Sequence, residues 1–477
     1  MKRKKNLKKS LLTLAILSLV FSASCQTSAP SVPAASPVAS VSAQPPAPTK
    51  EPPSARFAVL SDIHLFDRDL GASDAEVDEY LAQSGKLLSD SEEIFGSALE
   101  RILAEKPDFI LISGDLTKDG ERQSHEKLAR RLDRIADSGI KVFVLPGNHD
   151  IDNPNAVRIL PSGKTERVPS VDPAEFASIY GRFGYEGAVS RDPASLSYVA
   201  EPVGGLWLIA LDSAKCEGNL ARGKPESSGA VRAPTRIWLK ARLEEARSLG
   251  KTVIVSEHHP LMEHFDAMKA VFPKYVVDDN WSLVRLLASY DVRVAFSGHF
   301  HANSAVLRRF QSDEEGMRLK GKALCDIETG SLVTWPSPYR IVVLGKDGSI
   351  QVRSGRVEQL PSYAAAGKNF GVESREWCAG ALKGQAAKLL NKYFIRGKSL
   401  DYFSSAFADA MLAHFAGDAQ APEAPEPDKK TSSMPLPFAE GFFDRLIAGL
   451  YKEKAPAKVE LISDNEFSLD LSRPSGY

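Results

Sequence analysis

Five polar clusters carry the residues of this sequence whose types and spacing could do chemistry, and each cluster follows an apolar run of strand length. Six of the nine histidines lie in these clusters. Because ligands gather at the carboxyl ends of strands in α/β sheets, we expect side chains this far apart in the sequence to converge. The clusters are Ser61-Asp62-Ile63-His64, Gly114-Asp115, Gly147-Asn148-His149-Asp150, His258-His259-Pro260 and Gly298-His299-Phe300-His301.

The side chains in the clusters are of the kinds that bind divalent metal ions. Carboxylates, imidazoles and amides without thiolates suit hard or borderline metals, and alternating positions such as Asp62 and His64 can aim two ligands at one cavity. Seven candidate ligands exceed the needs of one tetrahedral site, whereas two metals that share a bridging carboxylate would use them all. Any single cluster is more typical of a turn or a capped helix than of a metal site. The five together, in this order, indicate a dinuclear centre of the kind used for displacement at phosphorus.

The elements that must position these clusters have the pattern of a layered α/β protein. From Arg56 onward, short β-branched runs alternate with amphipathic stretches. Apolar residues at helical spacing predict helices around 94–103 and 128–135. The second half is richer in strands, which suggests two facing sheets. Strands are predicted at 56–61, 109–113, 142–145, 206–211, 253–256 and 292–296, with further strands at 305–310, 323–328, 339–344 and 350–357.

The clusters resemble the DxH, GD, GNH(D/E), HxP and GHxH pattern of the calcineurin-like metallophosphoesterase superfamily, and the resemblance covers about residues 56–357. It implies a four-layer αββα sandwich of two mixed β-sheets flanked by helices. It also implies two divalent metal ions, which could be Mn, Fe, Zn, Mg or Ni. Carried over, one metal would be held by Asp62, His64 and His301, the other by Asn148, His258 and His299, and Asp115 would bridge them.

The resemblance also implies a catalytic pair, His149 and Asp150, next to the metals. A hydroxide that bridges the two cations would attack phosphorus. We expect His149 to give a proton to the leaving oxygen, because a histidine titrates near neutral pH, and Asp150 to orient its ring. The alternative for His149 is a structural role beside the ligands. His125 lies on an apolar helical stripe and is predicted to be a core histidine.

Departures from the family pattern narrow the substrate class. The segment 114–120 lacks the arginine typical of protein Ser/Thr phosphatases, and Lys118 stands where purple acid phosphatases have a metal-binding tyrosine. The remaining similarity is to bacterial enzymes that include cyclic-nucleotide phosphodiesterase-like proteins. We therefore expect hydrolysis of phosphate mono- or diesters of small molecules, with nucleotides and cyclic nucleotides as candidates. The long segments 65–90, 152–193 and 213–234 are predicted to set substrate choice, and the alternative is that they are family-specific additions without contact to the site.

Composition limits the other functions open to the chain. Its 477 residues are 43% hydrophobic and 25% charged, a composition that is typical of globular proteins and excludes a disordered or collagen-like chain. A net charge of −1 gives no basic field for specific nucleic-acid binding. The alternative to an enzyme is a surface lipoprotein that uses the fold as a non-catalytic binding module. Such a module is expected to have lost a ligand, and none is missing, which favours the enzyme.

The two ends of the chain predict export and a helical extension. Residues 1–24 hold six basic residues followed by an apolar run too short to span a bilayer, as in a signal peptide. The run leads through small residues to Cys25, which resembles a bacterial lipoprotein signal with a loosened lipobox. The alternative is an ordinary secretory signal with an incidental cysteine. We expect a Pro/Ala/Ser-rich tether at 25–54, a phosphoesterase domain at 55–360, and a helical extension at 361–477 with a Pro-rich linker at 417–437 and a last amphipathic helix at 438–451.

Lipidation of Cys25 predicts the compartment of the protein, namely the cell envelope with the chain anchored to a membrane. Replacing the thiol in Cys25→Ser is expected to move the protein from the membrane fraction to the soluble fraction, because acyl chains on that cysteine supply the anchor. Fractionation followed by immunoblotting measures the change. Membrane association that survives the substitution would contradict the assignment.

Overall fold

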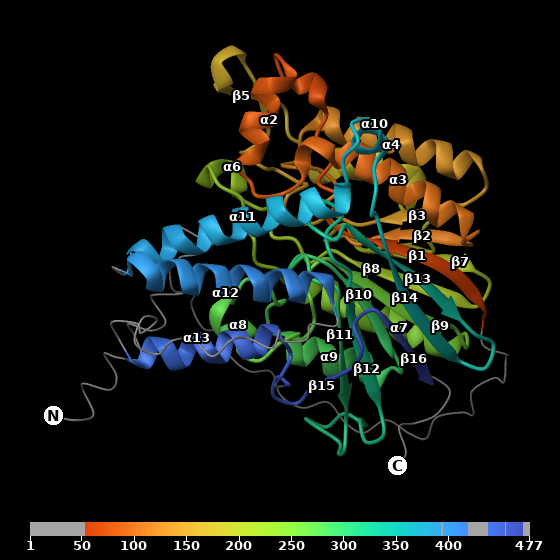
Figure 1. Ribbon diagram of the computed structural model, residues 1–477. Helices are drawn as coiled ribbons and strands as arrows, with labels where there is room; N and C mark the ends of the chain where they lie inside the picture. Colours follow the sequence, from red (N-terminus) through yellow and green to blue (C-terminus); the bar gives the residue numbers. More distant parts are fainter. Residues whose placement is uncertain (1–52, 393–394, 418–436, 454, 471–477) are drawn as a thin grey trace.

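Two mixed β-sheets form the centre of the computed structural model, which describes residues 53–392, 395–417, 437–453 and 455–470 (Figure 1). The predicted signal peptide, Cys25, nearly all of the tether and most of the Pro-rich linker lie outside the described residues. The first sheet has the order β16 (Glu466–Asp470), β14 (Ser349–Arg356), β13 (Pro338–Leu344), β1 (Ala55–Leu60), β2 (Phe109–Ile112) and β3 (Lys141–Val144).

The second sheet has a parallel centre with antiparallel strands at both edges. β8, β9, β10 and β12 are parallel, whereas β11 and β7 run antiparallel to their neighbours. Its order is β15 (Glu460–Leu461), β11 (Ser304–Arg309), β12 (Ala323–Glu328), β10 (Val294–Ser297), β9 (Thr252–Glu257), β8 (Leu206–Leu211), β7 (Tyr198–Val203) and β6 (Ser190–Arg191).

The two sheets pack face to face through an apolar core. The ring of Phe57 on β1 meets the ring of Phe296 on β10 edge to face, with centroids 5.5 Å apart. Helices α3 (Ser91–Ala104) and α4 (Arg122–Asp137) bury their apolar stripes with the first sheet. Helices α7 (Ala233–Ser248) and α9 (Asn280–Ser289) do so with the second. The predicted four-layer αββα sandwich is confirmed.

All ten predicted strands are present, each within two residues of its predicted bounds. The strands that were not predicted are short or flank the long segments: β4 (Val157–Ile159), β5 (Thr165–Arg167), β6, β7, β15 and β16. They lack the apolar run on which the predictions rested. β5, for example, is Thr-Glu-Arg, and all three residues are exposed. The segment 65–90 contains a helix that was not predicted, α2 (Asp74–Ala82).

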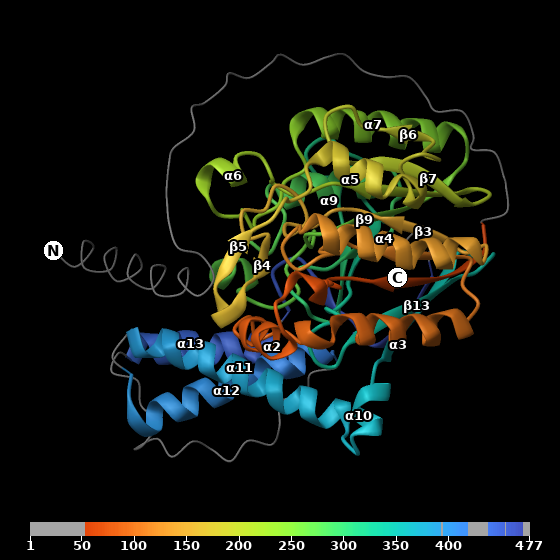
Figure 2. The same ribbon diagram turned by 90° about the horizontal axis from the view of Figure 1, so that it is seen from above.

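The extension past residue 360 forms the expected helices and also adds strands to the sandwich. Helices α11 (Phe370–Lys392), α12 (Gly397–Ala416) and α13 (Pro437–Leu450) lie side by side at one flank of the molecule (Figures 1 and 2). Beyond them, β15 pairs with β11 and β16 pairs with β14. These two strands were not predicted, and they make residues past 455 an integral part of both sheets.

The last helix packs on the sandwich. Leu446 and Leu450 of α13 are buried in one cluster with Phe265 and Met268. Arg445 of the same helix donates two hydrogen bonds, of 2.7 and 2.9 Å, to the carboxylate of Asp266. Among the described helices, none combines the length and apolar character that crossing a bilayer requires.

Candidate metal centre

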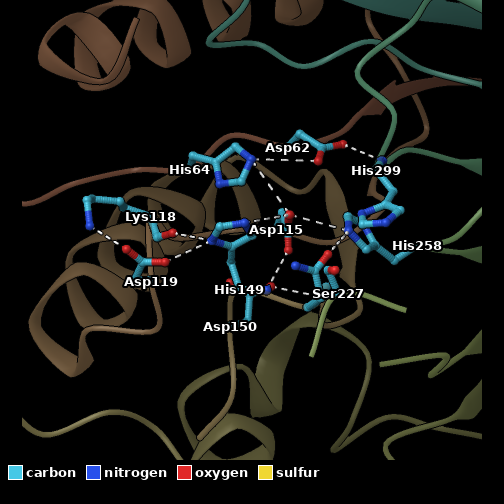
Figure 3. A network of polar contacts seen from close by, with 12 residues as sticks. Asp62, His64, Asp115, Lys118, Asp119, His149, Asp150, Ser227, His258 and His299 are labelled. Atoms are coloured by element: carbon cyan, nitrogen blue, oxygen red, sulfur yellow. Dashed lines mark hydrogen bonds and ion pairs between the residues drawn. The ribbon is translucent and has the colours of Figure 1, made fainter. Parts of the chain in front are cut away.

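The five polar clusters come together at the carboxyl ends of β1, β2, β3, β9 and β10, where the two sheets meet (Figure 3). Their side chains form three groups in which the ligand atoms lie within 4.8 Å of one another. The groups share members, so they make one continuous site. They are Asp62, His64 and His301, then His64, Asp115 and His149, and finally Asp115, His258 and His299.

Asp115 lies at the middle of the site. Its Oδ1 accepts a hydrogen bond of 2.9 Å from the backbone N–H of His149. Its Oδ2 faces three imidazoles, with Nε2 of His258 at 3.4 Å, of His64 at 3.7 Å and of His149 at 4.0 Å. One carboxylate therefore lies between both groups of predicted ligands, which is the position expected of a bridge.

Asp62 is positioned by neighbours that leave one of its oxygens directed at the histidines. Its Oδ2 accepts from Ser61 Oγ at 2.6 Å and from the backbone N–H of His299 at 3.0 Å. Its Oδ1 is buried, accepts no hydrogen bond from the described residues, and lies 3.2 Å from His301 Nε2. The Nε2 atoms of His64 and His301 are 3.4 Å apart. A divalent cation among these three atoms would satisfy all of them, so the residues fit a metal ion.

A backbone carbonyl orients His258, one of the predicted ligands of the other metal. His258 Nδ1 lies 2.9 Å from the carbonyl oxygen of Ser113, which can only accept, so Nδ1 carries the proton and Nε2 faces the site. The Nε2 atom is 3.2 Å from Asn148 Oδ1. His299 stacks on Tyr275, with ring centroids 4.5 Å apart. All seven predicted ligands are thus placed in one site by the fold.

The backbone at the site is strained in a consistent way. Five of the seven predicted ligands have left-handed backbone conformations, which non-glycine residues adopt rarely and at an energetic cost. These turns lie where the strands end, which is where the ligands leave the sheets. The five are Asp62 at φ 51°, His64 at 43°, Asp115 at 48°, His299 at 72° and His301 at 69°.

Two glycines of the motifs are required by close approach. A Cβ at Gly147 would lie 2.1 Å from Asp115 Oδ1, and one at Gly298 would lie 1.9 Å from Ser61 Oγ. Any side chain at these positions would displace the carboxylates of Asp115 and Asp62. Close packing against the carboxylates therefore explains why glycine precedes the ligands at these two positions.

The electrostatics of the site differ between the predicted ligands. Burial lowers the pKa of His258, but the carboxylate of Asp115 outweighs burial and raises that pKa to about 9. Burial lowers the pKa of His64, His299 and His301, so these imidazoles are neutral near pH 7 and have free lone pairs. Burial alone would raise the pKa of Asp115, but the imidazoles of His258 and His149 outweigh it and hold that pKa well below its usual range. The carboxylate is therefore ionised.

His259 is excluded from the ligand set by its surroundings. Its Nδ1 is 2.8 Å from Ser213 Oγ, and its Nε2 is 3.3 Å from the carbonyl oxygen of Ser227. This geometry agrees with the prediction that His258, and not His259, is the metal ligand. His125 is a core residue as predicted, since it is fully buried and its ring contacts Tyr180 Oη at 2.8 Å.

Asp150 does not orient the ring of His149, contrary to expectation. Its carboxylate accepts three backbone hydrogen bonds of 2.8 to 3.1 Å, from Gly147, Leu116 and Thr117, and one from the Thr117 hydroxyl. Adjacent residues in this turn point in different directions, so Asp150 ties the loops after β2 and β3 together. Burial raises its pKa to about 7.

Asp119 takes the place expected of Asp150. His149 Nδ1 lies 2.7 Å from the carbonyl oxygen of Lys118 and 3.0 Å from Asp119 Oδ1, so Nδ1 carries a proton and Nε2 faces the site (Figure 3). Asp119 is itself paired with the Lys118 ammonium. The sequence pattern did not identify Asp119, although an acidic residue four positions after Asp115 was a usable signal.

Lys86 is a second residue that the sequence pattern did not identify. It comes from the long segment 65–90, and its Nζ lies 2.8 Å from His64 Nε2. Nothing distinguishes one lysine in a long loop until the fold places it. The role of this segment in substrate choice stays a prediction.

The family can now be identified by comparison with known proteins. A family model described as calcineurin-like phosphoesterase matches residues 55–303, which is just over half of the chain. The chain belongs to this family. Because the predicted ligands are all present and converge, this phosphoesterase has complete clusters of candidate metal ligands and is an enzyme of the metallophosphoesterase class.

Individual relatives of the phosphoesterase are distant. A probable cyclic nucleotide phosphodiesterase of Synechococcus sp. (strain ATCC 27144) is 26% identical over 250 residues, which cover 51% of this chain and 72% of that protein. Another, from Synechococcus sp. (strain WH7803), is 24% identical over 310 residues, which cover 62% and 95%. Among solved structures, a dimetal phosphatase from Danio rerio has a TM-score of 0.42 and 14% identity, with 64% of this chain and 97% of that one covered.

The central position of Asp115 predicts the effect of removing its charge. Asp115→Asn keeps the size of the side chain but removes the anion shared by both groups, so bound metal is expected to fall and turnover to drop at least about a thousandfold. Elemental analysis of the purified protein measures the metal. The matched control is Asp347→Asn, in an exposed turn between β13 and β14, which should leave metal and activity unchanged. Two full metal equivalents in Asp115→Asn would refute the shared position.

Proposed function

We propose that this protein hydrolyses phosphate mono- or diesters of small molecules with the help of two divalent metal ions, and that nucleotides and cyclic nucleotides are among its substrates. The observation that carries the proposal is the buried Asp115 carboxylate between two sets of imidazoles. The distant relatives named as cyclic nucleotide phosphodiesterases support the nucleotide class.

The ligand assignment is the one that the family resemblance implies, and the distances support it. Asp62, His64 and His301 would hold one cation, and Asn148, His258 and His299 the other, with Asp115 between them. When bound, two such cations would lower the pKa of a water molecule and neutralise charge on the phosphoryl oxygens. The carbonyl oxygen of Ser113 and the backbone N–H of His149 fix the orientation of His258 and Asp115 before substrate arrives.

His149 is proposed as the proton donor to the leaving oxygen. Its Nδ1 proton is held by the Lys118 carbonyl and Asp119, which leaves Nε2 free to face the substrate. Its side chain is 28% exposed, so a ligand in the site can reach it. Burial lowers the pKa of His149, but Asp115 and Asp119 raise it by more, so the net shift is upward and favours the imidazolium. That form can donate a proton near neutral pH.

The location of the protein is part of the proposal. Export with a lipid anchor at Cys25 is supported by the six basic residues and the apolar run that precede this cysteine. Substrates would then be phosphate esters found outside the cytoplasm.

The function is tested by assaying purified residues 26–477, loaded separately with Mn, Fe, Zn, Mg and Ni, on p-nitrophenyl phosphate, bis-p-nitrophenyl phosphate and cyclic nucleotides. We expect metal-dependent release of product from at least one ester, abolished by Asp115→Asn. Absence of turnover with every metal, in protein shown to bind two equivalents, would refute the proposal.

The leaving group determines how much His149 matters. An alkoxide needs a proton in the transition state, whereas p-nitrophenolate leaves readily without one. His149→Gln is therefore expected to lose about 10² to 10⁴ in rate on alkyl or nucleoside esters and much less on p-nitrophenyl esters. Steady-state kinetics on both substrate types, with elemental analysis of the variant, measure this. Equal losses on both types, or loss of metal, would reassign His149 to a structural role.

Asp119 should set the alkaline limit of activity. Removing its charge in Asp119→Asn takes away a group that raises the pKa of His149, so the imidazolium loses its proton at lower pH. The high-pH limb of the kcat profile on alkyl esters is expected to move to lower pH. Asp150→Asn is the comparison: it should lower the melting temperature, because an amide cannot accept all four hydrogen bonds, and leave the limb in place. If the high-pH limb moves in Asp150→Asn and not in Asp119→Asn, Asp150 is the partner of His149 after all.

A further inference from the structure

The metal centre opens into a cavity of about 410 Å³. The residues around it include the predicted ligands, but part of its lining comes from α11 and α12, far outside the residues 55–303 that match the family. We call this part the α11–α12 wall. It consists of Cys378, Ala381, Leu382 and Gln385 of α11 and Met411 and Phe415 of α12.

The α11–α12 wall is firmly attached to the site. The carbonyl oxygen of Phe415 accepts a hydrogen bond of 3.1 Å from the backbone N–H of Asn303, two residues after the predicted ligand His301. The Phe415 and His301 rings lie with centroids 6.5 Å apart. Met411 and Phe415 are only 5% and 7% exposed. The wall is therefore a fixed part of the cavity.

The loop that carries Lys86 also rests on α11. Gly85 has φ +73°, and a Cβ there would lie 3.0 Å from Gln385 Nε2 and 3.1 Å from Ala381 Cβ. The backbone of the loop can approach the helix this closely only with glycine at this position. The contact places Lys86 at the rim of the cavity, 2.8 Å from His64 Nε2.

The chemistry of the lining defines what fits. Beyond the ligands and Lys86, the cavity is faced mainly by apolar side chains, including Leu382, Met411, Phe415, Phe272 and Phe300. Its volume is in the range that holds small-molecule ligands. A flat or compact apolar group can lie against these side chains while its phosphate lies at the ligands.

We propose that the α11–α12 wall selects the substrate: it restricts the site to small phosphate esters that carry one compact apolar or aromatic group. This inference rests on the proposed function and assigns its specificity to Leu382 and its neighbours on α11 and α12. The ammonium group of Lys86 binds the phosphate group of the substrate. The wall residues are specificity-determining and take no part in the chemical step.

The test changes the size of the cavity from the wall. Two substrate pairs differ only in the bulk of one aryl group: phenyl and 1-naphthyl phosphate as monoesters, and phenyl and 1-naphthyl p-nitrophenyl phosphate as diesters. Leu382→Trp should lower kcat/KM for the naphthyl ester at least about tenfold more than for the phenyl ester. Leu382→Ala should raise the ratio of kcat/KM for the naphthyl ester to that for the phenyl ester. Gly384→Trp, at an exposed position of α11 where a Cβ meets nothing within 4 Å, is the matched control and should leave the ratio unchanged.

The outcomes separate this inference from the proposed function. If the metal-loaded wild type hydrolyses no ester, the proposed function fails and the inference fails with it. If the wild type is active but both Leu382 variants leave the naphthyl-to-phenyl ratio unchanged, only the inference is refuted. Turnover of a phosphorylated protein at a rate similar to the aryl esters would also refute it. Metal content and melting temperature of each variant show whether the site and the fold are intact.

Discussion

A buried carboxylate, Asp115, surrounded by imidazole nitrogens is the interaction on which the rest of the structure depends. An isolated charge in the protein interior is very costly, so it persists only with partners placed around it. Here three Nε2 atoms lie within 3.4 to 4.0 Å of one oxygen, and a backbone N–H holds the other. The same arrangement of imidazole nitrogens around an ionised carboxylate is what a pair of divalent cations requires.

Such a site places a strict demand on the sandwich, because its ligands come from both sheets. Asp62 and Asp115 follow strands of the first sheet, and His258 and His299 follow strands of the second. Arg340 helps to fix the sheets relative to each other: it is fully buried on β13 and donates to the carbonyl oxygen of Glu328 on β12 at 2.6 Å. The left-handed turns at the strand ends then set the direction of each ligand. The stability of the packed sheets compensates for the local strain of those turns.

The sequence was sufficient for features that depend on local pattern. Strands such as 206–211 are continuous apolar runs, and the clusters after them contain distinctive residue types, so strand positions and the convergence of the clusters were predictable. The partner of His149 was not predictable, because the carboxylates of Asp119 and Asp150 both suit the role and only the turn geometry decides between them. Lys86, β15 and β16 depend on pairing between segments far apart in the chain, for which no local signal exists.

The attachment of the C-terminal helices has a consequence for the evolution of specificity. Asn303 binds the end of α12 through its backbone N–H, and its side-chain amide donates 3.0 Å hydrogen bonds to Ser354 on β14 and to Asn465 next to β16. One residue thus joins the segment that carries His301, the edge of the first sheet and the α11–α12 wall. Because β16 is also part of that sheet, the wall cannot shift without disturbing the strands that support the ligands. Substitutions on the cavity side of α11 can change the substrate without weakening the strands that support the ligands. The part of the chain that selects the ester is therefore separate from the part that cleaves it.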